Sequence, residues 1–381
     1  MLIPELTIGG AQHSFARLAW ALSIDYNIIP LVFDKGSNPF YLMPAEVRNL
    51  GTKPSNSFIS KIINATKRFI KLRRFKKSIQ PTACISFLEG ADYLNVLTKQ
   101  KEKVIISIRG SKVHDPNMQA YMFALRSKLL IPFLYKRADQ IVTVNKGIQN
   151  ELVNYFNLDV NKIKTIYNYI DNIDNSSNQN HSLPQVPFIL YSGRLAPEKG
   201  IIGLIKFFSS ITKEISNIKL VLLGDGPEKD NIVQCAQTYK LTIGKEIDNQ
   251  IVLVGNVRHT YTYIKNASVT VLNSVSEGFP NAMAESLLAG KRVVASDCPY
   301  GPREIFALGE GKEITDKEYP IETGGGTLLP PVDESSLMLW VKSICTIVNE
   351  KKYCDELFVK RFKEKTSQEN FINNWKDILK G

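Results

Sequence analysis

Two glutamates in the stretch SEGFPNAMAESLLAGKRVVASD (276–297) are the first side chains whose spacing suggests chemistry. Glu277 and Glu285 lie eight residues apart, a little over two helical turns, so one helix could present both carboxylates on the same side. Pro280 favours the first turn of a helix, which puts Glu277 in the preceding loop and Glu285 one to two turns inside. Taken alone, the stretch fits a two-carboxylate site and a capped surface helix with two solvated acids equally well.

A second candidate group is the basic loop GRLAPEKG (193–200), which follows an apolar run in the second half of the chain. It contains Arg194 and Lys199, with a conformationally fixed Pro197 between them and a glycine at each end. Two cations on a loop between a strand and a helix suit a diphosphate, because Arg binds as a planar fork and Lys as a point charge. The alternative is a surface loop in which Glu198 forms an ion pair.

Glycine-rich turns mark further candidate sites. Gly9 and Gly10 follow a short first strand and open a helix, where a glycine pair lets backbone N–H groups approach a phosphate; a simple tight turn is the alternative. GDGPEKD (224–230) is predicted as a turn that passes close to a nucleotide base or ribose, or that only caps a helix through Asp225. Two more turns are predicted at GPRE (301–304) and GGGTLLPP (324–331).

Runs of β-forming residues alternate with segments of helical period in both halves of the chain. This alternation predicts parallel sheets covered by helices on both faces, and therefore an α/β fold with two doubly wound, Rossmann-like domains. Such domains bind ligands at the carboxyl ends of their strands, where the loops above are placed. The predicted strands are 27–33, 83–88, 103–108 and 139–144 in the first half, and 188–194, 218–226, 250–255, 268–274 and 292–297 in the second.

The polar stretch DNIDNSSNQNHSLPQVP (171–187) is the best candidate for a linker. We predict one domain over residues 1–183 and a second over residues 184–358. A helical tail follows over residues 359–381. Phe362, Phe371 and Trp375 are its candidate buried residues.

Charge is distributed unevenly over the 381 residues. Residues 1–183 contain 24 Lys and Arg against 13 Asp and Glu, whereas residues 184–381 contain 24 of each, so the whole net charge of +11 lies in the first half. Such asymmetry indicates an anionic partner for that half. The five scattered cysteines argue against a disulfide framework or a zinc site. The sequence contains no signal peptide and no apolar run of membrane-spanning length.

The basic excess is concentrated in SKIINATKRFIKLRRFKKSIQ (60–80), which contains eight cations and no acidic residue. Apolar residues at roughly helical spacing predict an amphipathic helix with a dense basic face. A solvated surface helix is the alternative, but the missing acids argue against it. The basic face suits an anionic leaflet, at about 1 kcal/mol per cation, or the pyrophosphate of a polyprenyl-linked saccharide. Nucleic acid is not an expected partner, because no recognisable binding motif is present. The cations assigned to acceptor or membrane are Lys67, Arg68, Lys71, Arg73 and Arg74.

The order of these motifs is more specific than any one of them. Along the chain come G-G-A from Gly9, G-R-x-x-x-E-K-G (193–200), G-x-G-P (224–227), E-G-F-P-N-A-M-A-E (277–285) and D-x-P-x-G-P-R-E (297–304). This order resembles the GT-B retaining glycosyltransferases of family 4, the glycosyl transferases group 1. The resemblance covers nearly the whole chain, and the E-x7-E element is its most diagnostic part.

The resemblance implies two Rossmann-like domains that face each other across a cleft, with a final helix that crosses back to the first domain. The first domain would bind the acceptor and the second the nucleotide-sugar donor. By carry-over, Arg194 and Lys199 would hold the donor diphosphate. Glu277 would hydrogen-bond the hydroxyls of the donor sugar, and Glu285 would hold the ribose diol. The remaining donor-binding positions are Gly9, Gly10, Gly224, Gly278, Phe279, Pro280 and Asn281.

The implied reaction moves a hexose or N-acetylhexosamine from a nucleotide sugar, UDP-linked by family preference, to a hydroxyl group with retained anomeric configuration. Negative charge develops on the departing diphosphate, so Arg194 and Lys199 would stabilise the transition state more than the ground state. With Glu277 they are the predicted catalytic residues. No D-x-D motif occurs, so the sequence does not support a metal, and no cofactor is expected beyond the nucleotide sugar.

Two departures from the family pattern stand out. Many relatives have a histidine after the strand that corresponds to residues 103–108, whereas this chain has Arg109 there and His114 five residues later. Arg109 is predicted to touch the donor sugar or an acceptor phosphate. Relatives also have a few more residues before the first strand, which predicts a native start upstream of Met1.

The favoured setting is the assembly of a bacterial surface glycan, such as the O-antigen of lipopolysaccharide or a capsule, on a polyprenyl-pyrophosphate carrier. The enzyme would then be cytoplasmic and peripherally bound to the inner face of the cytoplasmic membrane. Two alternatives remain open: a nucleotide-sugar epimerase on the same fold, and a non-catalytic nucleotide-sugar-binding protein. The pairing of GRLAPEKG with E-x7-E argues against the first, and the intact charged residues argue against the second.

Overall fold

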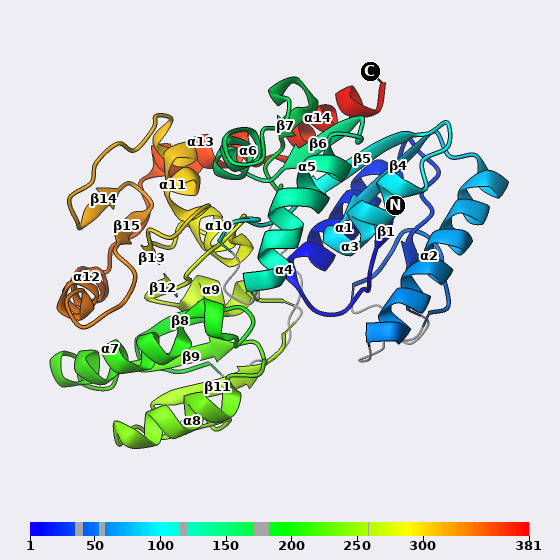
Figure 1. Ribbon diagram of the computed structural model, residues 1–381. Coiled ribbons are helices and arrows are strands. Elements are labelled where there is room, and N and C mark those ends of the chain that lie inside the picture. The colour runs from blue at the N-terminus through cyan, green and yellow to red at the C-terminus, as the bar shows by residue number, and fades with distance from the viewer. Residues whose placement is uncertain (35–40, 53–57, 115–119, 171–182, 258, 381) are drawn as a thin grey trace. The chain divides into compact units, whose positions relative to one another are not determined.

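The computed structural model describes every residue except 35–40, 53–57, 115–119, 171–182, 258 and 381 (Figure 1). The chain divides into two compact units. Unit 1 comprises Met1–Asn168 and Gln368–Gly381, and unit 2 comprises Tyr169–Ser367. Most of the stretch predicted as a linker falls on residues outside the description. The predicted domain boundary, after residue 183, lies directly beyond these residues.

Unit 1 is built on one parallel sheet whose strands follow the order β3-β2-β1-β4-β5-β6-β7. The order reverses between β1 and β4, which is the topological switch point of a doubly wound sheet. The longer strands coincide with the predicted apolar runs, because a strand buried on both faces needs apolar residues throughout. The strands are β1 (Leu2–Ile3), β2 (Leu31–Val32), β3 (Arg48–Asn49), β4 (Ala83–Phe87), β5 (Lys103–Ile108), β6 (Gln140–Thr143) and β7 (Ile163–Thr165).

Helices cover the sheet of unit 1. Helix α3 packs against both α2 and α5, whereas the C-terminal α14 packs against α1. The Lys103 ammonium donates a 2.6 Å hydrogen bond to the Ile378 carbonyl, which ties α14 to the sheet. The elements are α1 (Gly10–Leu22), α2 (Phe58–Ile79), α3 (Glu89–Leu97), α4 (Ala120–Leu125), the π-helix η1 (Arg126–Leu130), α5 (Ile131–Tyr135), α6 (Lys146–Asn154), the 3-10 helix η2 (Val160–Lys162) and α14 (Gln368–Lys380).

Unit 2 has a second doubly wound sheet, in the order β10-β11-β9-β8-β12-β13-β15-β14. All its pairs are parallel except β14 with β15. Its switch point lies between β8 and β12. From there, successive strands are added in opposite directions toward the two edges of the sheet. The strands are β8 (Phe188–Ser192), β9 (Lys219–Leu223), β10 (Ile243–Gly244), β11 (Ile251–Gly255), β12 (Val269–Leu272), β13 (Val293–Ser296), β14 (Ile321–Thr323) and β15 (Gly326–Leu329).

Two turn predictions in unit 2 were incomplete. In the stretch 324–331, Gly324 and Gly325 form a turn, but the residues that follow form the buried strand β15. The glycines of this stretch reflect close packing, because a Cβ on Gly326 would lie 1.9 Å from the Val293 carbonyl oxygen. Residues 301–304 do not form an isolated loop either, since Gly301 caps a helix and Pro302 occupies its first turn.

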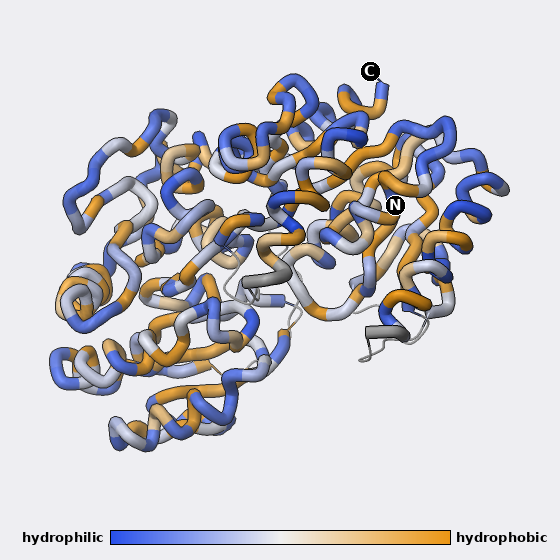
Figure 2. The backbone as a smooth tube through the Cα atoms, in the orientation of Figure 1, coloured by the Kyte–Doolittle hydropathy of each residue, from blue (hydrophilic) through white to orange (hydrophobic). Residues whose placement is uncertain are grey.

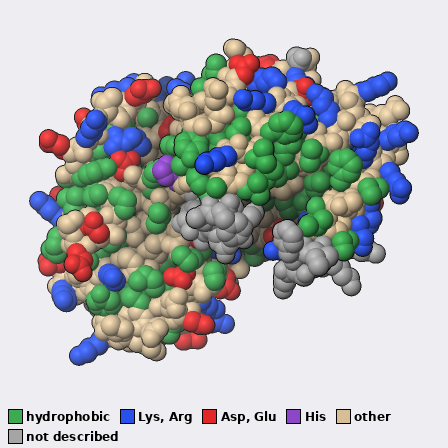
Figure 3. All heavy atoms as spheres, in the orientation of Figure 1, with side chains coloured by type: hydrophobic (Ala, Val, Ile, Leu, Met, Phe, Trp, Pro, Cys, Tyr) green, Lys and Arg blue, Asp and Glu red, His purple; other side chains and the backbone are tan. Residues whose placement is uncertain are grey.

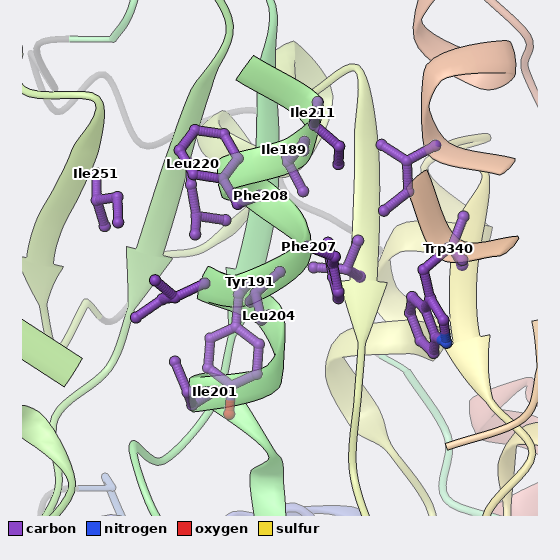
Figure 4. Packing of buried hydrophobic residues seen from close by; sticks show 14 of the residues in the cluster. Ile189, Tyr191, Ile201, Leu204, Phe207, Phe208, Ile211, Leu220, Ile251 and Trp340 are labelled. Atoms are coloured by element: carbon purple, nitrogen blue, oxygen red, sulfur yellow. The ribbon is translucent and has the colours of Figure 1, made fainter. Parts of the chain in front are cut away.

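The core of unit 2 fills the space between the sheet and its helices (Figure 4). Phe207 on α7 stacks on Trp340 of α12, with ring centroids 5.3 Å apart. Both rings are fully buried, and the Trp340 indole N–H donates to the Pro330 carbonyl at 2.9 Å. The helices are η3 (Pro197–Lys199, 3-10), α7 (Ile201–Glu214), α8 (Lys229–Thr238), α9 (Tyr261–Asn266), α10 (Asn281–Leu288), α11 (Pro302–Glu310), α12 (Leu337–Glu350) and α13 (Glu356–Lys365).

The helical tail consists of two helices, α13 and α14, with a break between Lys365 and Gln368. Helix α13 packs against α11 in unit 2, whereas α14 belongs to unit 1. Phe362, Phe371 and Trp375 are buried, as the sequence predicted. Along the chain, hydrophobic residues are concentrated in the strands and on the inward faces of helices (Figure 2). None of the described helices combines the length and the apolar character that crossing a bilayer requires.

Candidate active site

The switch point of unit 2 brings together two loops that the sequence had singled out. One loop follows β8 and contains Arg194 and Lys199, and the other follows β12 and contains Glu277. Backbone and side-chain hydrogen bonds join them: Asn273 donates from Nδ2 to the Gly200 carbonyl at 2.8 Å, and the Val275 N–H donates to the Glu198 carbonyl at 2.9 Å. The carboxyl ends of β8 and β12 therefore present one continuous surface.

An ion pair lies at the centre of that surface. Lys199 Nζ is 2.5 Å from Glu277 Oε1, and the Ser274 hydroxyl donates to the same oxygen at 2.6 Å. The Lys199 side chain is 22% exposed and the Glu277 side chain 9%. Among the described residues Glu277 Oε2 has no hydrogen-bond partner, so this oxygen is left to accept from a ligand.

The segment 297–304 supports the turn that carries Glu277. The Glu277 N–H donates to the Pro299 carbonyl and the Tyr300 N–H donates back to the Glu277 carbonyl, both at 3.0 Å. Gly301 has a φ of +91°, and a Cβ there would lie 2.9 Å from the Gly278 carbonyl oxygen. The glycine is needed both for its backbone conformation and for this close approach.

Asp297 and Arg303 hold the supporting segment in place. Arg303 Nε donates to both carboxylate oxygens of Asp297 at 3.1 Å, and the Tyr319 hydroxyl donates to Oδ2 at 2.7 Å. Arg303 Nη1 also donates to the Ile314 carbonyl at 3.0 Å. Asp297 and Arg303 of the D-x-P-x-G-P-R-E motif thus position the backbone behind Glu277.

Arg194 lies at the open side of the site. Its side chain is exposed, and no ion pair or side-chain hydrogen bond to another described residue is present. The glycines beside it allow two loops to approach closely, because a Cβ on Gly224 would lie 1.9 Å from the Gly193 carbonyl oxygen. The Leu195 N–H donates to the Asp225 carbonyl at 3.0 Å, which closes the contact between the loops after β8 and β9.

Glu285 lies in the second turn of α10, where the sequence placed it. Its Oε2 accepts a 3.2 Å hydrogen bond from the hydroxyl of Thr260, the residue before α9. Phe279 is buried and Pro280 precedes the helix, whereas Asn281 is its first residue and is half-buried. The two glutamates thus occupy different surroundings, one beside a cation and the other beside a hydroxyl.

The predicted site residues of the first half lie in unit 1. Gly9 precedes α1 and Gly10 begins it, and the first turn of that helix contains no acidic side chain. One turn further, His13 stacks on Tyr41 with ring centroids 4.9 Å apart. Burial, reinforced by the charge of Arg17, lowers the pKa of His13 to about 3. The imidazole is therefore neutral at ordinary pH.

Arg109 ends up as a half-buried cation at the carboxyl end of β5. Its guanidinium lies 5.2 Å from the centroid of the Phe87 ring and donates to Asn168 Oδ1. Asn168 in turn donates from Nδ2 to the Ser14 hydroxyl of α1 at 3.2 Å. Burial lowers the pKa of Arg109 to about 9. No carboxylate among the described residues pairs with this cation.

The basic stretch forms helix α2, but its cations have different roles. Lys67, Arg73 and Arg74 are exposed. Arg68 donates to the Thr52 hydroxyl at 2.9 Å and Lys71 donates to the Leu50 carbonyl at 2.6 Å, so these two also fix the helix to the strand before it.

Lys76 does not belong to the exposed basic face that the sequence predicted. It is buried and pairs with Glu102 at 2.7 Å. Its counter-charge comes from Glu102, which lies outside the helix. The absence of acidic residues within the basic stretch therefore did not show that Lys76 is unpaired.

Several contributors to the site were not singled out from the sequence. Asn273 and Ser274 are the last two residues of the predicted strand 268–274, so the rule that ligands bind at carboxyl ends could have found them. Thr260 and Asn168 carry no motif. Their roles depend on partners 25 and 59 residues away in the chain.

Comparison with known proteins identifies similar chains. Residues 172–322 match the family model described as glycosyl transferases group 1. The N-acetylgalactosamine-N,N'-diacetylbacillosaminyl-diphospho-undecaprenol 4-alpha-N-acetylgalactosaminyltransferase of Campylobacter jejuni is 28% identical over 316 residues, which cover 80% of this chain and 82% of that protein.

Solved structures resemble the whole chain. Sucrose-phosphate synthase from Thermosynechococcus elongatus has a TM-score of 0.77 at 16% identity, with 100% of this chain and 97% of that one covered. Anabaena HepE, in complex with UDP and glucose, has a TM-score of 0.71 at 14% identity, with 100% and 99% covered. These likenesses confirm the predicted GT-B class of fold, with its two parallel-sheet α/β domains.

Proposed function

We infer the function of this chain from the premise that its residues 172–322 belong to the glycosyl transferases group 1, the family that its motifs resemble. We propose a metal-independent, retaining glycosyltransferase. It moves a hexose or N-acetylhexosamine from a UDP-sugar to a hydroxyl of a growing bacterial surface glycan. The acceptor is carried on a polyprenyl pyrophosphate.

The ion pair of Lys199 and Glu277 is the observation that carries this proposal. It places a cation and a carboxylate side by side at a switch point, with the exposed Arg194 on the same loop as the cation. The two cations stabilise the charge that develops on the departing diphosphate. The carboxylate is held rigid by Lys199 and Ser274 through Oε1. Its Oε2 then accepts hydrogen bonds from the sugar.

Glu285 completes the donor site in this proposal. A carboxylate that accepts from Thr260 can also accept from a second pair of hydroxyls, those of the ribose. The two glutamates then bind the two sugars of one nucleotide sugar. The complex of HepE with UDP and glucose supports a UDP-sugar as the donor, at the level of the shared fold.

The acceptor assignment rests on unit 1. The Campylobacter relative is named for an acceptor on diphospho-undecaprenol, and a lipid carrier of that kind is anionic. The exposed cations Lys67, Arg73 and Arg74 on α2 supply the matching charge. We propose that α2 binds the anionic membrane surface or the acceptor pyrophosphate from the cytoplasmic side. If the protein does not bind anionic vesicles at low salt, the proposed contact of α2 with the membrane is contradicted.

Donor binding is tested by thermal shift with UDP-Glc, UDP-Gal, UDP-GlcNAc, UDP-GalNAc and GDP-Man. A bound ligand raises the melting temperature by mass action. We expect a shift with UDP-sugars in the wild type and in the control Glu214→Ala, which removes an exposed carboxylate at the end of α7. The shift should be lost in Glu285→Ala. A shift that persists in Glu285→Ala would contradict the assigned role.

Turnover is tested separately by UDP release. Slow hydrolysis of the UDP-sugar, lost in Lys199→Ala, distinguishes an enzyme from a non-catalytic binding protein. Binding without any hydrolysis or transfer to lipid-linked acceptors would favour the binding protein. Conversion of one UDP-sugar into its epimer would favour the epimerase.

A further inference from the structure

The segment α4–η1–α5 of unit 1 exposes a row of large apolar side chains. Leu125, Leu129 and Phe133, which we call the outer ridge, are 45%, 56% and 54% exposed. The opposite side of the same segment is buried through Ile131, Leu134 and Tyr135. The segment therefore has its own contact with the core, and the outer ridge is not needed to hold it in place.

The surroundings of the outer ridge are basic. The sequence from 120 to 138 contains no Asp or Glu. The Arg137 guanidinium lies 4.1 Å from the centroid of the Phe133 ring. The first acid after the segment, Asp139, is already paired with Lys99 at 2.5 Å. The exposed cations of the segment are Lys128, Lys136 and Arg137.

The neighbouring helices extend the same kind of surface. Helix α3 packs against both α2 and α5, and Leu97 at its end is 44% exposed. On α2, Ile62, Ile63 and Ile70 are 52%, 47% and 40% exposed, between the exposed cations of that helix. Figure 3 shows hydrophobic side chains gathered on unit 1, with Lys and Arg toward its edge.

The acids nearest the segment, Glu89 and Asp139, are paired with Arg126 and Lys99. Exposed apolar side chains framed by exposed cations match one kind of surface. A lipid leaflet with anionic headgroups offers apolar depth for the side chains and negative charge for the cations. Charge alone does not explain leucine and phenylalanine at these positions. A single amphipathic or electrostatic contact also binds weakly, and stable anchoring takes two signals.

We propose that the outer ridge inserts into the boundary between headgroups and acyl chains of an anionic leaflet, as a second docking element beside α2. The charges of α2 attract the leaflet and the outer ridge adds apolar burial. Two elements on separate helices also fix how unit 1 is rotated on the membrane, which a single helix would leave free. Docking through the outer ridge does not depend on the transferase activity, but it builds on the proposed contact of α2 with the membrane.

The test is sedimentation with vesicles of phosphatidylcholine, with and without phosphatidylglycerol. Leu125→Ser/Leu129→Ser/Phe133→Ser is expected to lower the partition coefficient on phosphatidylglycerol vesicles by about tenfold or more, since three apolar side chains lose their burial. The matched control is Ile24→Ser/Met338→Ser/Leu357→Ser, whose side chains are 77%, 64% and 56% exposed elsewhere. It should bind as the wild type does.

Salt separates the two elements. Lys67→Ala/Arg73→Ala/Arg74→Ala should remove the salt-sensitive part of binding, whereas the ridge variant should remove the part that survives high salt. In addition, Phe133→Trp should show a blue-shifted emission with phosphatidylglycerol vesicles, a readout that does not require removing the ridge. The ridge variant should keep its thermal shift with UDP-sugars, so a failure here is distinct from a failure of the proposed activity.

Three results would overturn the proposal. The ridge variant could bind anionic vesicles as tightly as the wild type. The emission of Phe133→Trp could remain unshifted on vesicles that bind the protein. Finally, the wild type could self-associate and ignore vesicles, with the ridge variant monomeric, which would make the outer ridge an interface between two copies of this chain.

Discussion

Lys199 Nζ lies 2.5 Å from Glu277 Oε1, although the two residues are 78 positions apart in the chain. The contact joins the loops that leave β8 and β12, on the two sides of the switch point. Each side chain is therefore oriented before any ligand arrives. Such preorganisation spares the reorganisation that a flexible cation and a flexible carboxylate would need during the reaction.

Removing either member of this pair should lower transferase activity strongly. We expect Lys199→Ala and Glu277→Gln each to reduce kcat/KM by about 10²–10³, comparable with the loss of one fixed charge-stabilising group. The double variant should lose little more than one single variant, because the residues act as a unit. The control is Lys352→Ala, which breaks the exposed pair with Glu350. If the factor by which the double variant loses kcat/KM equals the product of the two single factors, the two residues work independently.

Gly200 is the position where the backbone of the site tolerates least change. Its φ is +65°, and a Cβ there would lie 2.1 Å from the Asn273 carbonyl oxygen. Gly290 has a similar φ of +74° but open space around it. Gly290→Ala should therefore cost only about 1–2 kcal/mol of unfolding free energy for its left-handed backbone. Gly200→Ala should cost more and also lower activity. Equal costs in urea unfolding would contradict this argument.

Local patterns were sufficient for much of the fold. Residues 103–108 form β5 over the predicted residues, because a strand buried on both faces is apolar along its length. The same argument holds for 83–88 and 188–194. The sequence placed a short strand before Gly9 and a strand over residues 27–33, where the structure has only the two-residue strands β1 and β2. The two-residue strand β3 was not predicted, and only its pairing with β2 defines it.

Contacts between residues far apart in the chain could not be predicted from the sequence. Lys76 looks like its basic neighbours, yet Glu102 makes it a buried structural cation. The motifs named Lys199 and Glu277 separately, and only the structure pairs them. The ring contact of Arg109 with Phe87 and its bond to Asn168 likewise depend on how three strands end at one edge. Composition and spacing carry no information on such pairings.

The buried His13 should make acid stability sensitive to one residue. The folded state protonates it only near pH 3, whereas the unfolded chain does so near pH 6.5. The unfolded state therefore binds more protons in this window, and stability falls as the pH falls. The free energy of unfolding changes by about 1.4 kcal/mol per pH unit for one such group. Between pH 6.5 and 5, the unfolding free energy of His13→Gln should therefore fall by about 2 kcal/mol less than that of the wild type.

Urea unfolding at several pH values measures this difference. Asp92 also titrates, since burial raises its pKa to about 7. Its contribution has the opposite sign, because the folded state binds its proton more tightly. It is present in both proteins, however, so it cancels in the comparison. His259→Gln, which changes an exposed histidine, is the control. Parallel stability curves for wild type and His13→Gln would show that His13 is not the sensitive group.

Arg109 is a half-buried cation without a carboxylate partner among the described residues, and such a charge destabilises a fold unless an anion compensates it. Asn168 is 5% exposed and already accepts from the guanidinium, so Asn168→Asp adds a counter-charge with almost no change in shape. We expect this variant to melt at a higher temperature, by of order 1 kcal/mol of stability. It should also lose activity, because the new carboxylate competes with the anionic group of the substrate.

Asn154→Asp, an exposed position at the end of α6, controls for added charge. A variant that gains stability and keeps full activity would show that Arg109 binds no anion.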